Sequence, residues 1–183
     1  MKSNSKNAPH DFLTKNKNKI HMNYLGFDKQ KVTPVVNELN KLLCNYHVYY
    51  QNLRNFHWNI TGENFFDLHS KFEELYNDAR IKIDEIAERI LTLRHRPLSR
   101  LSDYITISDV SEATLVEHDR EMVIIVLENH RIIIENLRSV ISAASEANDE
   151  GTIDMAGGFL ESLEKKSWML DAWALRKLQD ATA

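Results

Sequence analysis

Hydrophobic residues recur every three or four positions through most of the chain, which is the spacing of one face of an α-helix. A first helix is predicted to run to about residue 60, with Thr33 as its N-cap and Pro34 at its first position. Gly62 interrupts the pattern. A second helix is then predicted from Asn64, as N-cap, to about Leu93.

The next stretch, residues 94–113, contains Pro97 and several Ser and Asp residues. It is predicted to be a connection with one short helix around Leu101–Ile107. A third long helix is predicted to begin with a capping box over residues 114–117 and to end near Ala147. Gly151 is predicted to end the following turn, and Thr152 to cap a fourth helix that runs to about Leu178.

Four long helices with one long connection are the pattern of an all-α, ferritin-like four-helix bundle, in which that connection crosses from one end to the other. The composition agrees, because 183 residues suit one domain and only five glycines and three prolines occur. We therefore expect a bundle domain over residues 33–180. Residues 1–32, rich in Asn, Lys and Ser, are predicted to be a flexible tail.

Cys44 is the only cysteine, which excludes a fold built on internal disulfides. No apolar run is long enough to span a membrane, and the N-terminus has no apolar signal segment, so we expect a cytoplasmic protein. The net charge of −4 is uneven, because five lysines against Asp11 give residues 1–19 a charge of about +4 and leave about −8 elsewhere. These lysines are Lys2, Lys6, Lys15, Lys17 and Lys19.

Two histidines flank the predicted turn between the first two helices. His57 continues the apolar stripe of the first helix, and His69 lies twelve residues later, on the second. Both are six residues from the turn centre near residue 63. Residues equidistant from the turn of an antiparallel hairpin lie at the same height, so the two imidazoles are expected to face each other.

Asp84 and Glu88 lie four residues apart on the second helix, so they share a face and can hold one cation. Asp84 is fifteen residues beyond His69, roughly 22 Å along a helix, whereas metal–ligand bonds are about 2 Å long. One chain therefore cannot close the site. The angular offset of about 60° nevertheless points His69 and Asp84 broadly the same way.

A second copy of this helix, packed antiparallel, would place His69 of one chain beside Asp84 and Glu88 of the other. A two-fold axis near residues 76–77 would then generate two identical sites, as an isologous dimer requires. Two imidazoles and two carboxylates suit Fe(II), with Zn(II), Mn(II) and Co(II) as competitors, and Glu73 is a weaker candidate ligand. The same pattern also occurs where histidines are hydrogen-bonded core residues and the acidic pair is solvated, so spacing alone leaves the site open.

The segments around these residues closely resemble the Dps family, the ferritin-like DNA-binding proteins from starved cells. The resemblance spans about Thr33 to Leu178 and rests on NFHWN (55–59), FFDLHSKFEELY (65–76), DEIAERI (84–90), DEGT (149–152) and WML (168–170). It implies a hollow dodecamer built from two-fold dimers, with inter-subunit ferroxidase sites. Such a cage oxidises Fe(II), with hydrogen peroxide in preference to oxygen, and stores ferric mineral, which protects DNA from oxidative damage.

Carried over by position, the resemblance implies that one subunit supplies His57 and His69 and that its partner supplies Asp84 and Glu88. The Glu-x-x-His motif of classical di-iron bundles is absent from the sequence, which favours the interface site over a centre inside each bundle. For Trp58 two roles are open, a trap for a stray oxidising equivalent and simple interface packing.

The resemblance also implies a three-fold pore lined by Asp149, Glu150 and Asp154, which would draw cations inward. The alternative is a helix N-terminus that favours acidic residues. The tail lysines are candidate contacts to DNA in the nucleoid, in a salt-dependent mode, or a plain solubilising extension. Two further functions stay open: a DNA-compacting protein with a mainly structural metal site, and a helical dimer that binds zinc for stability.

Overall fold

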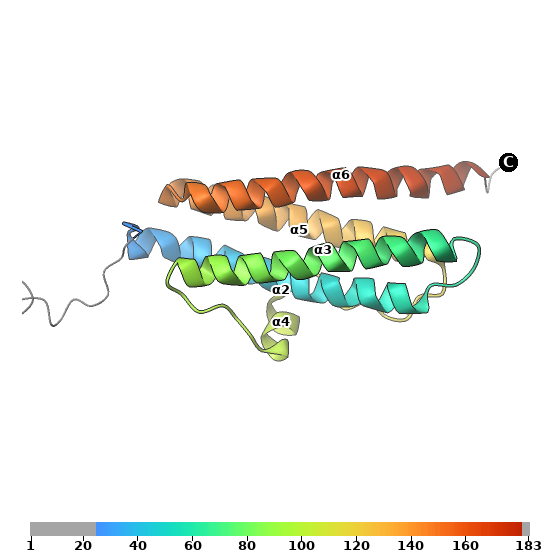
Figure 1. The fold of residues 1–183 in the computed structure, drawn as a ribbon, viewed down its shortest axis with the longest axis horizontal. Coiled ribbons are helices and arrows are strands. Elements are labelled where there is room, and N and C mark those ends of the chain that lie inside the picture. Colours follow the sequence, from blue (N-terminus) through green and yellow to red (C-terminus); the bar gives the residue numbers. More distant parts are fainter. Residues whose placement is uncertain (1–24, 181–183) are drawn as a thin grey trace, which may run out of the picture.

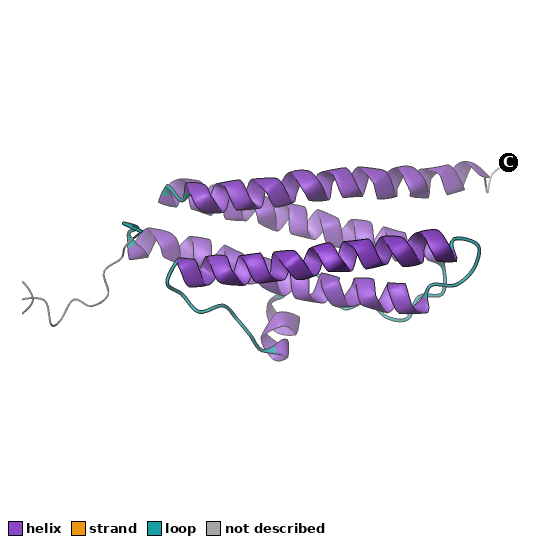
Figure 2. Cartoon of the chain, viewed as in Figure 1, coloured by secondary structure: helices purple, strands orange, loops and turns teal. Residues whose placement is uncertain are grey.

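The computed structural model describes residues 25–180, which contain five helices and no strand (Figures 1 and 2). Four of the helices are long and run alongside one another, and the short helix lies beside α2 (Figure 1). This arrangement confirms the predicted all-α bundle with a short helix in its long connection. The helices are α2 (Lys29–Asn59), α3 (Phe65–Thr92), α4 (Leu101–Ile107), α5 (Asp119–Ala147) and α6 (Glu150–Asp180).

The long helices pair as two antiparallel hairpins, α2 with α3 and α5 with α6, and α2 also packs against α5. Between the hairpins, residues 93–118 run from one end of the bundle to the other and carry α4 on the way (Figure 2). Burial of apolar surface between the helices drives their assembly. The largest fully buried side chains include Leu39, Leu42, Tyr46, Tyr49, Phe56, Phe72 and Ile86.

The first helix begins one turn earlier than predicted. Asp28 is its N-cap and accepts a hydrogen bond from the Gln30 amide, at 2.8 Å. Thr33 is inside the helix, where its hydroxyl donates to the Lys29 carbonyl, and Pro34 follows it within the same helix. The prediction of Thr33 as cap was wrong because the added turn buries Val32 in the core.

The predicted capping box before α5 does not form, and α5 begins at Asp119. Two amide side chains of α2 hold the segment before α5 against α2. Asn52 accepts a hydrogen bond from the Ala113 amide and donates one to the Ser111 carbonyl. Asn55 donates to the Ala113 carbonyl. These tertiary hydrogen bonds override the local helix-start signal.

The start of α6 also differs from the prediction, because Asp149 rather than Thr152 caps it. The Asp149 carboxylate accepts hydrogen bonds from the Thr152 amide and hydroxyl, at 3.1 and 2.6 Å, and pairs with Arg89 of α3. Gly151 lies inside the helix rather than in the turn. A Cβ at Gly151 would come within 3.1 Å of the Arg89 guanidinium, so a larger residue would crowd this ion pair.

Candidate metal centre

The two histidines meet across the α2–α3 hairpin, as predicted. His57 lies in the last turn of α2 and His69 in the second turn of α3. Their rings stack, with 3.8 Å between centroids and an interplanar angle of 23°. Nδ1 of His57 is 2.8 Å from the backbone carbonyl of His69, and Nδ1 of His69 is 2.8 Å from the backbone carbonyl of His57. Each ring is therefore anchored on the backbone of the opposite helix.

These two hydrogen bonds determine which nitrogen of each ring is free. A carbonyl oxygen only accepts, so Nδ1 carries the proton in both rings, and a neutral imidazole then has its lone pair on Nε2. No hydrogen bond within the described residues uses Nε2 of either ring. A histidine whose Nδ1–H is held by a carbonyl and whose Nε2 is free is the usual arrangement of a metal ligand.

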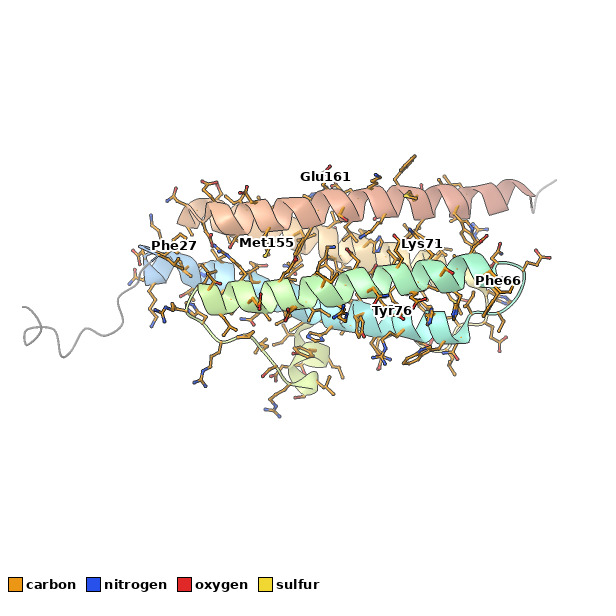
Figure 3. All side chains as sticks on the ribbon, in the orientation of Figure 1. Phe27, Phe66, Lys71, Tyr76, Met155 and Glu161 are labelled. Atoms are coloured by element: carbon orange, nitrogen blue, oxygen red, sulfur yellow. The ribbon has the colours of Figure 1, made fainter. Side chains whose placement is uncertain are left out.

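Aromatic neighbours restrict the pair further. Phe65 stacks on His69, with 4.9 Å between centroids, and Tyr76 meets His57 edge-on at 5.3 Å. Tyr76 projects from α3 (Figure 3). Its hydroxyl donates a hydrogen bond to Glu73, at 3.3 Å. His57 itself is buried, whereas His69 is partly exposed. The imidazoles thus have one orientation before any metal binds.

Phe65 and Tyr76 were not recognised as part of the site from the sequence. Tyr76 lies seven residues after His69, which is two helical turns and the same face. That spacing is the signal that could have identified it. Glu73, the weaker candidate ligand, is exposed and lies between His69 and Tyr76 on α3.

Asp84 and Glu88 lie on the exposed surface of α3, toward its far end. Fifteen residues separate Asp84 from His69, which corresponds to roughly 22 Å of helix. Among the described residues of one chain, no three His, Cys, Asp or Glu side chains come together as a metal site. One chain therefore brings two of the four predicted ligands together, and the two-chain site stays a prediction.

Comparison with known proteins identifies the family to which the bundle belongs. A family model described as a ferritin-like domain matches residues 36–179. The DNA protection during starvation protein of Porphyromonas gingivalis is 44% identical over 155 residues, which cover 82% of this chain and 95% of the relative. The chain belongs to the Dps family.

Solved structures of the Dps family share the fold. The Dps protein of Vibrio cholerae O1, described as a member of a broad superfamily of ferritin-like diiron-carboxylate proteins, has a TM-score of 0.81 and 41% identity, covering 82% of this chain and 95% of that one. The Dps protein of Bacillus brevis has a TM-score of 0.77 and 39% identity, over 80% of this chain and 98% of that one. The bundle and its crossover are thus those of a Dps subunit.

Trp58, beside the histidine pair, is 59% exposed in the single chain. The guanidinium carbon of Arg54 lies 4.5 Å from its ring centroid, in a cation–π contact. Arg54 also lies over the ring of Tyr50, at 5.3 Å. Exposure of a large indole suits both roles considered for Trp58 in a Dps protein, interface packing and capture of an oxidising equivalent.

The three acidic residues considered for a pore divide into two groups. Asp149 is fully buried, and its carboxylate is engaged by Arg89 and Thr152. It is therefore a helix cap and an ion-pair partner, which removes it from the pore-lining candidates. Glu150 and Asp154 are exposed on α6, and for them the pore stays a prediction.

The tail lysines predicted to contact DNA, at positions 2, 6, 15, 17 and 19, lie outside the described residues. Within the described residues, none of the helices has the length and apolar character needed to cross a membrane.

Proposed function

We propose that this Dps protein binds Fe(II) between paired subunits, oxidises it, and stores the ferric product inside a dodecameric cage. The observation that carries the proposal is the reciprocal histidine pair, because its hydrogen bonds leave both Nε2 atoms free to bind a metal ion. Because both imidazoles are already held by hydrogen bonds, less conformational entropy is lost when Fe(II) binds. A mixed set of imidazoles and carboxylates suits Fe(II) as the substrate.

Each site takes His57 and His69 from one subunit and Asp84 and Glu88 from its partner, with Glu73 as a further ligand. The carboxylates are exposed in one chain, which leaves them available to the partner. Two negative charges beside two neutral imidazoles favour a divalent cation and stabilise the added charge of Fe(III). This difference in stabilisation is what an oxidation site has to provide.

The proposed oxidant is hydrogen peroxide, with oxygen as the slower alternative. One peroxide accepts two electrons and two protons, so two Fe(II) become two Fe(III) while the O–O bond breaks and two waters form. Because both electrons are taken at paired irons, no hydroxyl radical is released. Such a cage in the cytoplasm would protect DNA by consuming Fe(II) and peroxide together.

Co-assembly of two inactive variants tests whether the site is shared. One variant is His57→Asn/His69→Asn, and the other is Asp84→Asn/Glu88→Gln. A mixed dimer of these chains contains one site with all four ligands intact and one with none. Random pairing should therefore restore about a quarter of the wild-type rate of Fe(II) oxidation.

The contrary result is equally clear. If all four ligands came from one chain, every site in the mixture would lack two of them and no activity would return. Separately refolded variants mixed after assembly serve as the control, since no subunits exchange into mixed dimers. Wild-type oxidation by either variant alone would show that these residues are not the ligands.

A second candidate function is DNA compaction with a mainly structural metal site, which the basic charge of residues 1–19 favours. A gel shift compares the full chain with a variant that lacks residues 1–19. Loss of retardation in the deletion variant, with iron oxidation unchanged, would assign DNA binding to the tail. Equal retardation of DNA by both proteins would show that the tail is not the DNA-binding segment.

A further inference from the structure

Two fully buried tyrosines of α2 lie side by side in the bundle, yet their hydroxyls differ. The rings of Tyr46 and Tyr49 are 6.2 Å apart, in an edge-to-face arrangement. The Tyr49 hydroxyl lies 2.7 Å from Nε2 of His130, a buried residue of α5. The Tyr46 hydroxyl is buried and has no hydrogen-bond partner among the described residues. The two phenols therefore form a natural comparison.

The direction of the hydrogen bonds at His130 follows from its other neighbour. The Ser167 hydroxyl donates to the Leu163 carbonyl, at 2.7 Å, so its oxygen accepts from Nδ1–H of His130, at 2.8 Å. A neutral imidazole carries one proton, which leaves the lone pair on Nε2. Tyr49 must then donate its hydroxyl proton to Nε2. A directed chain thus runs from Tyr49 through His130 to Ser167.

Burial keeps Tyr49 protonated and His130 neutral, which are the protonation states that this chain of hydrogen bonds requires. It lowers the pKa of His130 to about 3, an effect to which the Lys166 charge adds and which the Asp78 charge opposes. It also raises the pKa of the Tyr49 phenol well above its usual value. At neutral pH a protonated phenol therefore faces a neutral imidazole.

We infer that Tyr49 is a redox-active tyrosine that loses one electron while its hydroxyl proton moves to Nε2 of His130. The inference rests on the proposed function, since the oxidant is a one-electron oxidising equivalent from the reaction of peroxide with a single Fe(II). The oxidant gains the electron, the Tyr49 O–H bond breaks, and the Nε2–H bond forms. The products are a neutral phenoxyl radical and an imidazolium.

The position of Tyr49 suits this role. It precedes His57 by eight residues on the same helix, roughly 12 Å along the axis. Its burial separates a phenoxyl radical from solvent and from other chains. Return of an electron from a further Fe(II), with the proton from His130, restores the starting pair. Oxidation of Tyr46 has no such route, because its hydroxyl has no hydrogen-bond partner among the described residues to take the proton.

The test is electron paramagnetic resonance of the assembled protein, freeze-quenched after Fe(II) at less than one ion per site has reacted with peroxide. A tyrosyl spectrum is expected for the wild type and for Tyr46→Phe, and a loss of at least tenfold for Tyr49→Phe. In D2O the wild-type spectrum should narrow, because the proton on Nε2 of His130, which is hydrogen-bonded to the phenoxyl oxygen, is replaced by deuterium. An undiminished tyrosyl spectrum in Tyr49→Phe would overturn the inference.

Two further measurements separate this inference from the proposed function. The rate of Fe(II) oxidation is followed in the same samples, and a normal rate with no tyrosyl spectrum overturns the inference alone. In a second arm, azide radicals made by pulse radiolysis oxidise the iron-free protein, and phenoxyl absorption lost in Tyr49→Phe supports the inference even if iron is not oxidised. The deuterium effect on the wild type needs no variant, so a misfolded Tyr49→Phe does not block the test.

Discussion

His57 and His69 anchor each other, since Nδ1 of each ring donates to the backbone carbonyl of the other at 2.8 Å. Loss of either side chain therefore removes one ligand and one of the two hydrogen bonds that join α2 to α3 here, while the other ring keeps its backbone acceptor and loses its stacking partner. His57→Ala should lower the rate of Fe(II) oxidation by about tenfold or more, because it removes a ligand and loss of an outer-shell contact alone typically costs 10–100-fold. The double variant His57→Ala/His69→Ala should lower the rate further, because His69 keeps its backbone acceptor in the single variant. Stopped-flow absorbance of the ferric product measures the rate.

His57→Asn is the matched control for this coupling. The amide Nδ2 of Asn stands near the position of Nδ1 and can still donate to the His69 carbonyl, while the ligand atom is lost. The backbone of His69 should then stay fixed against α2, so the affinity for Co(II), a spectroscopic substitute for Fe(II), should be higher in His57→Asn than in His57→Ala. Equal Co(II) affinity in the two variants would show that the hydrogen bond to the His69 carbonyl does not help to order the site.

Spacing within one element or one hairpin was enough to predict three features of the structure. These are the apolar faces of the long helices, the short helix at Leu101–Ile107 and the facing histidines. The caps could not be predicted in this way. Asn52 and Arg89, from distant helices, determine where α5 and α6 begin. The anchors of the histidine rings also escaped prediction, because a backbone carbonyl is the same at every position and only the fold brings it within reach.

The buried ion pair between Arg89 and Asp149 is predicted to be important for stability. Asp149 is fully buried, so Arg89→Met would leave its charge uncompensated, at a cost of about 3–5 kcal/mol. Chemical denaturation of the assembled protein measures this change. Arg138→Met is the control, because the Arg138–Glu164 pair is exposed and such pairs contribute about 0–1 kcal/mol.

A second variant checks the reason for that loss. Adding Asp149→Asn to Arg89→Met removes the unpaired charge but keeps an oxygen that can accept from the Thr152 amide. The double variant should therefore be more stable than Arg89→Met alone. If it is less stable, the cost lies in lost packing of the arginine side chain rather than in the buried charge.

His130 predicts a specific acid sensitivity. Its pKa is about 3 in the folded protein, mainly because of burial, against about 6.5 when unfolded, so between these values only the unfolded chain binds the proton. Stability conferred by the neutral ring is complete above pH 6.5 and falls as the pH drops, by about 1.4 kcal/mol per pH unit. His130→Gln lacks this titration, so its unfolding free energy should approach that of the wild type between pH 6.5 and 4. Parallel pH profiles for the two proteins would refute this assignment.

Arg54 is predicted to protect Trp58 from oxidation. Its guanidinium carbon lies 4.5 Å from the indole centroid, and loss of an electron would place a second positive charge beside it. Two unit charges at this distance repel by about 1 kcal/mol in water, which corresponds to roughly a fivefold effect on the equilibrium. Arg54→Gln should therefore raise the yield of oxidised Trp58 severalfold after cycles of Fe(II) and peroxide, as measured by mass spectrometry of the peptide that contains it.

Arg138→Gln is the control for this prediction, because it removes an exposed arginine that pairs with Glu164 and should leave the yield of oxidised Trp58 unchanged. An equal yield in Arg54→Gln and the wild type would contradict protection by Arg54. Absence of oxidised Trp58 in both proteins would show that the indole does not receive oxidising equivalents from the iron site, and its exposure would then fit interface packing.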